Sequence, residues 1–212
     1  MKIFNNIIFL VLFTILSCKE SIIDTPTPVS SPAKNVVINE LFRIDSTKYY
    51  SHWWLEIYNP TKKDVSITNW KIKFINSNFE ISLSDQKTTN VISQGTFIVI
   101  TNNKNIFNDF WNIAPLTILL DFSKNFPIIK DNDEIQLIDN ENKIISILRF
   151  GNYKCSGNDP FPNNKSFGTV KEWHSICRYS DPFGAFDTGN SENDFFEETK
   201  PIVGYYSQRM KY

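Results

Sequence analysis

The sequence predicts an all-β protein folded as a sandwich of two sheets. Short apolar stretches alternate with polar residues at a period of two, turn residues separate these stretches, and long segments with the 3.6-residue period of a helix are few. The chain has 212 residues, 41% of them hydrophobic, which is enough for one domain with a buried core. No internal repeat of 20–50 residues is evident, and this disfavours a propeller or a solenoid.

The N-terminus predicts a signal peptide over residues 1–17. Lys2 carries the only side-chain charge, and an apolar run follows from Ile7 to Leu16. A helix of about ten residues is ~15 Å long, half of a ~30 Å hydrocarbon core, so a permanent transmembrane span is not expected. The run ends at Ser17-Cys18, which resembles the lipobox of bacterial lipoproteins. We therefore expect Cys18 to be acylated, the alternative being an ordinary secretory peptide that ends near a cysteine.

Residues 18–35 predict a tether between the lipidated cysteine and the domain. Pro26, Pro28 and Pro32 stand among Ser and Thr, a composition typical of an extended linker. Lys19-Glu20 resembles the signal that sends some lipoproteins to the outer face of the outer membrane. The expected location is the outer membrane, exposed at the cell surface, with a periplasm-facing anchor as the alternative.

The folded part is expected over residues 36–208. Segments 70–74 and 79–83 alternate apolar and polar residues, as a strand with one wet face does. Segment 97–100 is apolar on both faces and suits a central strand. Segments 135–138 and 143–150 flank a polar stretch, as the two strands of a hairpin do. One short helix is plausible, at 105–112. Further strands are predicted at 36–42, 53–58, 64–68 and 116–121.

The part after Phe150 is expected to be rich in loops, because it holds six of the seven glycines. It also holds Cys155 and Cys177, and an exported chain meets an environment that permits disulfides. We expect these two cysteines to form a disulfide, the alternative being two buried thiols.

Several motifs, in order along most of 35–208, resemble the lamin tail domain family. Segment 37–40 (VINE) is similar to its opening strand, 54–60 (WLEIYNP) to its signature strand and turn, and 65–72 (VSITNWKI) to the next segment, with Asn69 in place of a glycine. The resemblance implies an immunoglobulin-like β-sandwich. It also implies structural roles for Glu40, Trp54, Glu56, Asn59 and Trp70.

Sequence motifs for catalysis are absent. His52 and His174 stand in no metal-ligand or triad spacing, and HExxH, GxSxG, P-loop and CxxC patterns do not occur. The acids of 131–141 do not have the spacing of an EF-hand and are interpreted as strand ends and a hairpin tip, although Ca²⁺ binding there is left open. We expect no cofactor and no resident metal.

An aromatic cluster before the signature strand is the candidate binding feature. Alternation places Trp53 in the core with Leu55 and Ile57, so Tyr49 and Tyr50 are the better candidates for ligand contact.

The predicted function is a non-catalytic binding or adhesion module, expected to be a monomer held at a membrane by its lipid. Its partner is an unidentified protein or glycan; the net charge of -1 argues against nucleic acid. An accessory subunit of an outer-membrane uptake system or of an extracellular hydrolase or nuclease is the main alternative. A small β enzyme that uses one of the histidines is a third.

Overall fold

The structure is a computed structural model, and it describes residues 30–44, 52–85, 90–122, 128–155, 157–181, 184–205 and 209–211. The predicted signal peptide, Cys18 and the candidate contact residues Tyr49 and Tyr50 lie outside these ranges. Those expectations therefore stay predictions.

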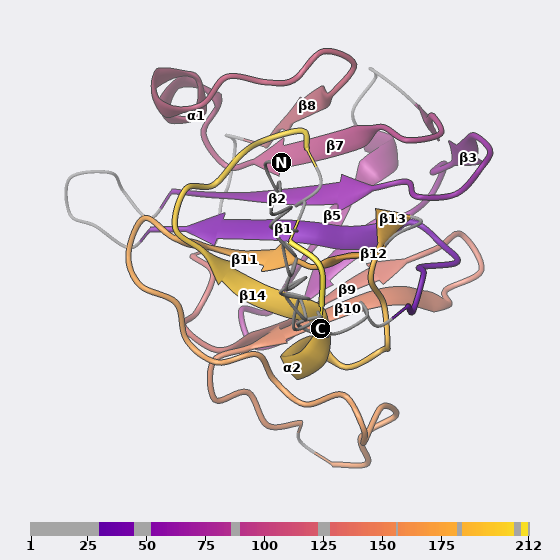
Figure 1. The fold of residues 1–212 in the computed structure, drawn as a ribbon, viewed down its shortest axis with the longest axis vertical. Coiled ribbons are helices and arrows are strands. Elements are labelled where there is room, and N and C mark those ends of the chain that lie inside the picture. Colours follow the sequence, from indigo (N-terminus) through magenta and orange to yellow (C-terminus); the bar gives the residue numbers. More distant parts are fainter. Residues whose placement is uncertain are drawn as a thin grey trace, which may run out of the picture.

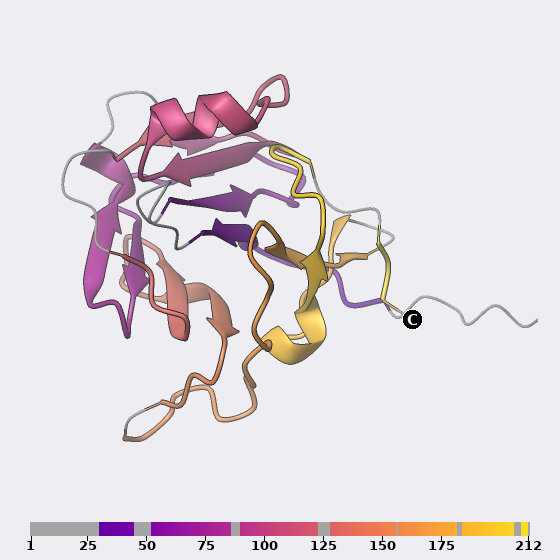
Figure 2. The ribbon, with the colours of Figure 1, turned by 90° about the vertical axis from the view of Figure 1, so that its left-hand side faces the viewer.

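Two β-sheets pack face to face (Figures 1 and 2). The larger has six strands in the order β14-β11-β1-β2-β7-β8, and the smaller has four in the order β10-β9-β4-β5. All neighbours within these two sheets are antiparallel except β7 and β8, which are parallel. The strands of the larger sheet are β14 (Phe195–Glu198), β11 (Ser175–Arg178), β1 (Val37–Arg43), β2 (Trp53–Tyr58), β7 (Phe97–Thr101) and β8 (Ile118–Asp121). Those of the smaller sheet are β10 (Ile144–Phe150), β9 (Asp133–Ile138), β4 (Lys71–Phe74) and β5 (Phe79–Ser82).

This architecture confirms the predicted all-β immunoglobulin-like sandwich. The predicted strands between Val36 and Phe150 are present, because each carries an alternating or continuous apolar run bounded by turn residues. The predicted helix is also present, as α1 (Lys104–Phe110). The side chain of Asn103 caps it by accepting a hydrogen bond from the Ile106 N–H at 3.1 Å.

The main core fills the space between the two sheets. Alternate residues of each strand point inward, so both sheets contribute apolar side chains to it. Its fully buried members include Ile38, Leu41, Trp53, Leu55, Ile57, Ile72, Phe74, Ile98, Ile100, Ile135, Leu137 and Leu148.

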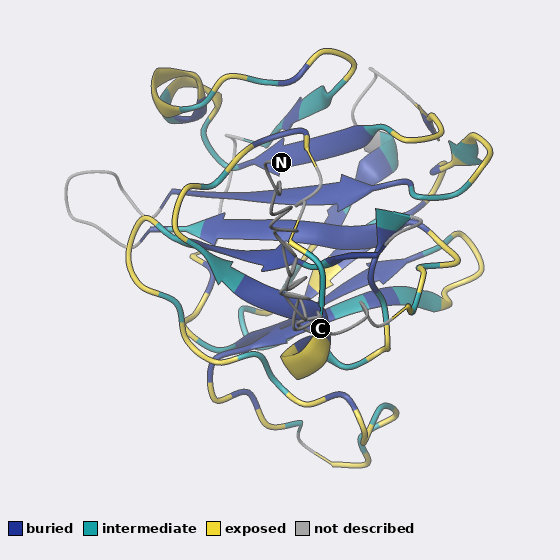
Figure 3. Cartoon of the chain, in the orientation of Figure 1, coloured by how far each residue is buried: buried dark blue, intermediate teal, exposed yellow. Residues whose placement is uncertain are grey.

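The central strands of the larger sheet are buried on their outer face as well (Figure 3). There, α1 and the C-terminal segment 199–205 cover the sheet, and Val203 packs with Trp54, Val99 and Phe107. Figure 2 shows this segment on the side of the larger sheet away from the smaller one. The long run of buried residues in β1 and β2 follows from this double coverage.

The C-terminal third is more regular than the sequence predicted. β11 pairs with β1, and β14 pairs with β11, so the two strands complete one side of the larger sheet. Arg178 joins them to the rest of the fold: its Nε donates to the Ile38 carbonyl at 2.8 Å and its Nη1 to the Phe186 carbonyl at 2.8 Å.

Smaller elements close the ends of the sandwich. β3 (Val65–Ser66) pairs with β6 (Val91–Ile92), and β12 (Ser180–Asp181) pairs with β13 (Gly184–Ala185). A 3₁₀ turn, η1 (Leu83–Asp85), follows β5, and a four-residue helix, α2 (Ser191–Asp194), precedes β14. Within the described residues, no helix is long and apolar enough to cross a membrane.

The described chain enters the domain at residues 31–33, inside the range assigned to the tether. The Ser31 N–H donates to the Asp181 carboxylate at 2.6 Å, and the Ala33 N–H donates to the Ala185 carbonyl at 2.8 Å. The entry point therefore lies beside the β12–β13 pair.

Candidate functional site

The signature strand β2 has the two faces that its alternation predicts. Trp53, Leu55 and Ile57 point into the core between the sheets, whereas Trp54 joins the cluster on the outer face. Trp53 packs against Phe74 and Phe79, with ring centroids 5.6 and 6.2 Å away. Its predicted place in the core is confirmed.

Glu56 and Glu40 face each other across β2 and β1, and both are fully buried. Glu56 accepts hydrogen bonds from the Asn39 amide at 2.7 Å and from the Gly204 N–H at 2.5 Å. Glu40 accepts one from the Ser175 hydroxyl. Through these hydrogen bonds, the two acids link β1, β2, β11 and the C-terminal segment.

Burial controls the charge of both acids. It raises the pKa of Glu56 to about 8, although the hydrogen bonds from Gly204 and Asn39 act in the opposite direction. It also raises the pKa of Glu40 well above its usual range, and the nearby Glu56 adds to this effect. Because neither carboxyl reaches solvent, they suit a structural role better than acid–base chemistry on a substrate.

Asn59 and Trp70 also occupy structural positions. The buried Asn59 amide donates to the Lys63 carbonyl at 2.9 Å and to the Ile92 carbonyl at 3.0 Å, which fixes the turn after β2. Trp70 lies in the main core. Asn69, which stands where the family has a glycine, adopts a left-handed φ of 60°, a conformation that asparagine tolerates better than most residues.

The predicted Cys155–Cys177 disulfide is wrong for this structure: each cysteine keeps its thiol. Cys177 is buried in β11, between β1 and β14, and its Sγ contacts the Arg178 carbonyl at 3.8 Å. Burial raises the pKa of its thiol. Cys155 lies in the loop after β10, a strand of the smaller sheet, and it interacts with Tyr153. The sequence argument paired these two cysteines only because they remained after Cys18 was assigned to the lipid, and the structure has both thiols free.

Four of the five acids of 131–141 form hydrogen bonds or ion pairs within the protein. Asp133 accepts the N–H groups of Asn76 and Ser77 at 2.6 and 3.1 Å, and Glu134 forms an ion pair with Arg149 at 2.5 Å. Asp139 accepts two backbone N–H groups of its hairpin. In the part of the chain that the structure describes, no three His, Cys, Asp or Glu side chains are placed to share a metal ion.

The two histidines lie in different settings. His52 is buried with its Nδ1 3.0 Å from the Asn102 side-chain oxygen, and burial lowers its pKa to about 4, so it is neutral at pH 7. His174 pairs with Glu197 at 2.7 Å. His174 and Cys177 are three positions apart in mostly extended chain, which puts their Cα atoms about 10 Å apart, too far for a nucleophile–base pair.

An aromatic surface lies between α1 and the turn that precedes β11. We use this name for Phe110, Trp111 and Trp173. The Phe110 and Trp173 rings are 5.4 Å apart, and Phe110 is 5.6 Å from Trp111. Phe110 is 45% exposed and Trp173 is 38% exposed, values that are high for large apolar side chains.

Buried rings support this surface from below. Phe42 contacts Trp111 edge-on at 4.7 Å and stacks on Trp54 at 5.7 Å, and it also reaches Trp173 at 6.3 Å. His52 lies 5.4 Å from Trp111. The exposed rings are therefore backed by β1 and β2.

Trp173 adopts a left-handed backbone conformation with a φ of 66°. This conformation is costly for a bulky residue, and such strain gathers at functional positions. Sequence reasoning did not single out Phe110 or Trp111. Their spacing gives no binding signal, and they meet Trp173 only because the fold brings α1 next to the 171–174 turn.

Comparison with known families identifies the fold. The sequence matches the Lamin Tail Domain family over residues 29–152, more than half of the chain. The chain belongs to the lamin tail domain family. Among curated proteins, none matches the sequence significantly.

The matched span of the lamin tail domain covers β1 to β10, so it includes both strands that carry the acid pair. β11 and β14 follow it in the chain, yet they complete the larger sheet. The aromatic surface combines the two parts, since Phe110 and Trp111 lie within the matched span and Trp173 lies beyond it. An immunoglobulin-like fold of this kind is typical of interaction modules rather than of enzymes.

Proposed function

We propose that this lamin tail domain protein is a non-catalytic binding module, held by lipid on Cys18 at the outer face of an outer membrane. The signal-peptide pattern, Ser17-Cys18 and Lys19-Glu20 support the anchor and its location. The aromatic surface supports the binding role, because exposed, rigidly backed rings are typical of recognition surfaces.

The proposed ligand is a glycan. One face of a sugar ring consists of C–H groups that pack against an aromatic ring, while its hydroxyl groups need polar partners. Exposed polar residues directly precede the rings in the sequence: Asn108 and Asp109 on α1, and Lys171 and Glu172 in the turn before Trp173. A purely apolar partner would leave these polar groups without compensation when it covered them.

Affinity electrophoresis of the full chain in detergent would test this role, with xylan, laminarin, hydroxyethyl cellulose and mannan as separate probes in the gel. We expect at least one polysaccharide to retard the parent. Trp173→Ala and Phe110→Ala should each weaken retardation by about tenfold, as expected for an aromatic contact.

Val91→Ala is the matched control, because Val91 is an exposed apolar residue on β6, outside the aromatic surface. It should bind like the parent. Equal retardation of the parent and Trp173→Ala would place the binding site elsewhere. If none of the four polysaccharides retards the folded parent, the glycan assignment is wrong, and a protein ligand becomes the alternative.

A further inference from the structure

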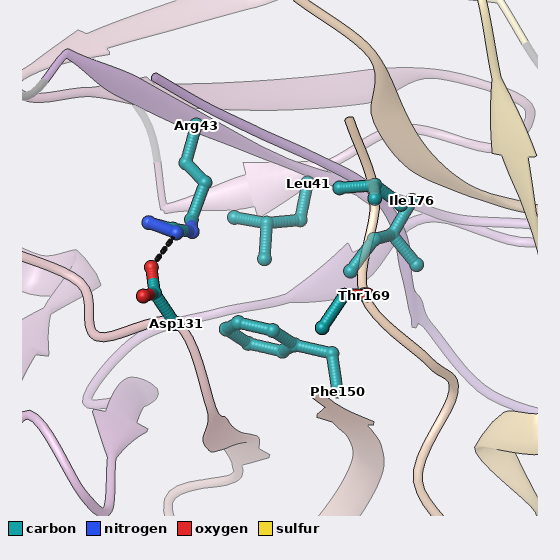
Figure 4. Close-up of a pocket in the computed structure, with 7 residues that line it drawn as sticks. Leu41, Arg43, Asp131, Phe150, Thr169 and Ile176 are labelled. Atoms are coloured by element: carbon teal, nitrogen blue, oxygen red, sulfur yellow. Dashed lines mark hydrogen bonds and ion pairs between the residues drawn. The ribbon is translucent and has the colours of Figure 1, made fainter. Parts of the chain in front are cut away.

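A cleft opens between the two sheets (Figure 4), and none of the residues that line it belongs to the aromatic surface. Its volume is about 260 Å³. β1 and β11 contribute Leu41 and Ile176, β10 contributes Phe150, and the loop before β11 closes it with Thr169 and Val170. Arg43 and Asp131 stand together at one end of this group.

The walls of the cleft are mainly apolar. Leu41, Phe150 and Ile176 belong to the main core, and Val170 packs against it. For comparison, an apolar cavity of about 150 Å³ accepts benzene. The cleft therefore has room for one small ring with a short chain, or for a branched chain of similar size, and is smaller than most drug-sized pockets.

The charge at the end of the cleft favours an anion. Arg43 is close to the apolar wall, two residues from Leu41 on β1, and its side chain is only 21% exposed. Its partner Asp131 is 83% exposed. An ion pair with so exposed a carboxylate contributes little to stability, so a bound carboxylate can replace Asp131 on the guanidinium.

The backbone holds this end of the cleft in place. Gly151 has a φ of +65°, and a Cβ at this position would lie 2.3 Å from the Asp131 carbonyl oxygen. The end of β10 therefore packs directly on the backbone of Asp131. Arg43 also lies 3.5 Å from the Ile129 carbonyl, to which it donates a hydrogen bond. Movement of the Asp131 side chain into solvent leaves these backbone contacts intact.

We propose that this cleft binds a small apolar carboxylic acid. Its carboxylate pairs with Arg43 in place of Asp131, and its ring or branched chain lies against Leu41, Phe150 and Ile176. A matched amine is a poorer ligand, because its charge would have to pair with Asp131 in solvent while the half-buried Arg43 repelled it. This site does not depend on the glycan-binding role.

Isothermal titration calorimetry of the full chain in detergent micelles would test the proposal, with empty micelles as the blank. The probes are phenylacetate, 4-methylpentanoate and, as the matched amine, phenethylamine. We expect at least one of the two acids to bind at least tenfold more tightly than the amine. Arg43→Met should weaken binding of that acid by at least tenfold. Asp131→Asn should strengthen its binding several-fold, because the competing carboxylate is gone.

Thr169→Trp provides a test that leaves the charges unchanged. Thr169 is exposed at the rim, so the indole can fill the cleft without entering the core, and binding should be lost while the melting temperature stays close to that of the parent. Equal affinity of the parent and Thr169→Trp would overturn the assignment to this cleft. Failure of both acids to bind the folded parent would overturn the ligand class.

Discussion

Burial of Glu56 beneath the C-terminal segment links the protonation of one carboxyl to the stability of the whole sheet. The pKa of Glu56 rises from 4.5 to about 8 on folding. The folded state thus holds this proton more tightly than the unfolded chain, so its stabilising effect is fully present below pH 4.5 and is lost as the pH rises through 8. His52 titrates in the opposite sense, because its pKa falls from 6.5 to about 4 on folding; its contribution is lost only below pH 6.5.

We therefore predict that the free energy of unfolding falls between pH 6.5 and 9, by on the order of 1–2 kcal/mol. Glu56→Gln should reduce this fall, because a neutral amide can accept from Gly204 and, once the Asn39 amide is reversed, donate to Asn39. Denaturant titrations at pH 6.5, 8 and 9 would measure it. Glu141→Gln, an exposed change on the β9–β10 hairpin, is the control. A parent whose stability does not fall over this range would contradict the linkage.

Trp53 and Trp173 contrast a core tryptophan with a surface one. Trp53→Ala removes a fully buried ring and should cost about 3–5 kcal/mol, which lowers the melting temperature by roughly 10 °C or more. Trp173→Ala should cost less than about 1 kcal/mol, because the ring is partly exposed. Thermal unfolding followed by circular dichroism would compare them. Similar melting temperatures for the two variants would show that the roles of these residues have been confused.

At the scale of elements, the sequence was informative wherever one physical pattern decided the structure. Alternation over 70–74 and 79–83 located β4 and β5, and the asparagine-rich tip located the β9–β10 hairpin. It was much less informative for β11 and β14. Each has only four residues. β11 pairs with β1 across more than 130 residues of chain, and β14 joins the sheet through β11.

The candidate sites show the same limit. A cysteine count cannot tell whether two thiols lie within bonding distance, so the disulfide prediction failed. The aromatic surface and the cleft each combine segments that are far apart in the chain. Local residue patterns carry no signal for such combinations.

Arg178 links β11 and β14 to the rest of the fold. It is buried, bonds two backbone carbonyls, lies 3.5 Å from Asp194 and covers the Phe195 ring at 4.3 Å. Arg178→Met keeps most of the volume but leaves Asp194 and both carbonyls without this cation. We predict a loss of about 3–5 kcal/mol.

Limited proteolysis would show where this loss acts. Cleavage of Arg178→Met should begin within residues 171–205, while β2, β7 and β9 stay protected longer. Lys143→Met, an exposed change on the hairpin, should be cleaved like the parent. Uniform cleavage throughout Arg178→Met would mean that β11 and β14 do not unfold separately from the rest of the sheet.

For the whole molecule, the proposed binding role depends on where the domain is held. Because Ser31 is already hydrogen-bonded to the domain, the covalent distance from Cys18 is set by residues 19–30. Twelve residues span at most about 40 Å when fully extended. The lipid on Cys18 would thus keep the domain within about one molecular diameter of the membrane. The aromatic surface would then contact only ligands that come this close to the membrane.

The anchor itself gives the last prediction. Cys18→Ala removes the thiol that the proposed acylation requires, so the protein should lose its lipid mass and leave the washed membrane fraction. Cys155→Ala is the matched control and should stay with the membrane, because Cys155 belongs to the folded domain. Mass spectrometry of the N-terminal peptide and immunoblots of fractionated cells would compare the two variants with the parent. Protease added to intact cells should degrade the parent if the domain faces outward, and protection from it would favour the periplasm-facing alternative. An unchanged mass and an unchanged membrane fraction for Cys18→Ala would overturn the lipid anchor.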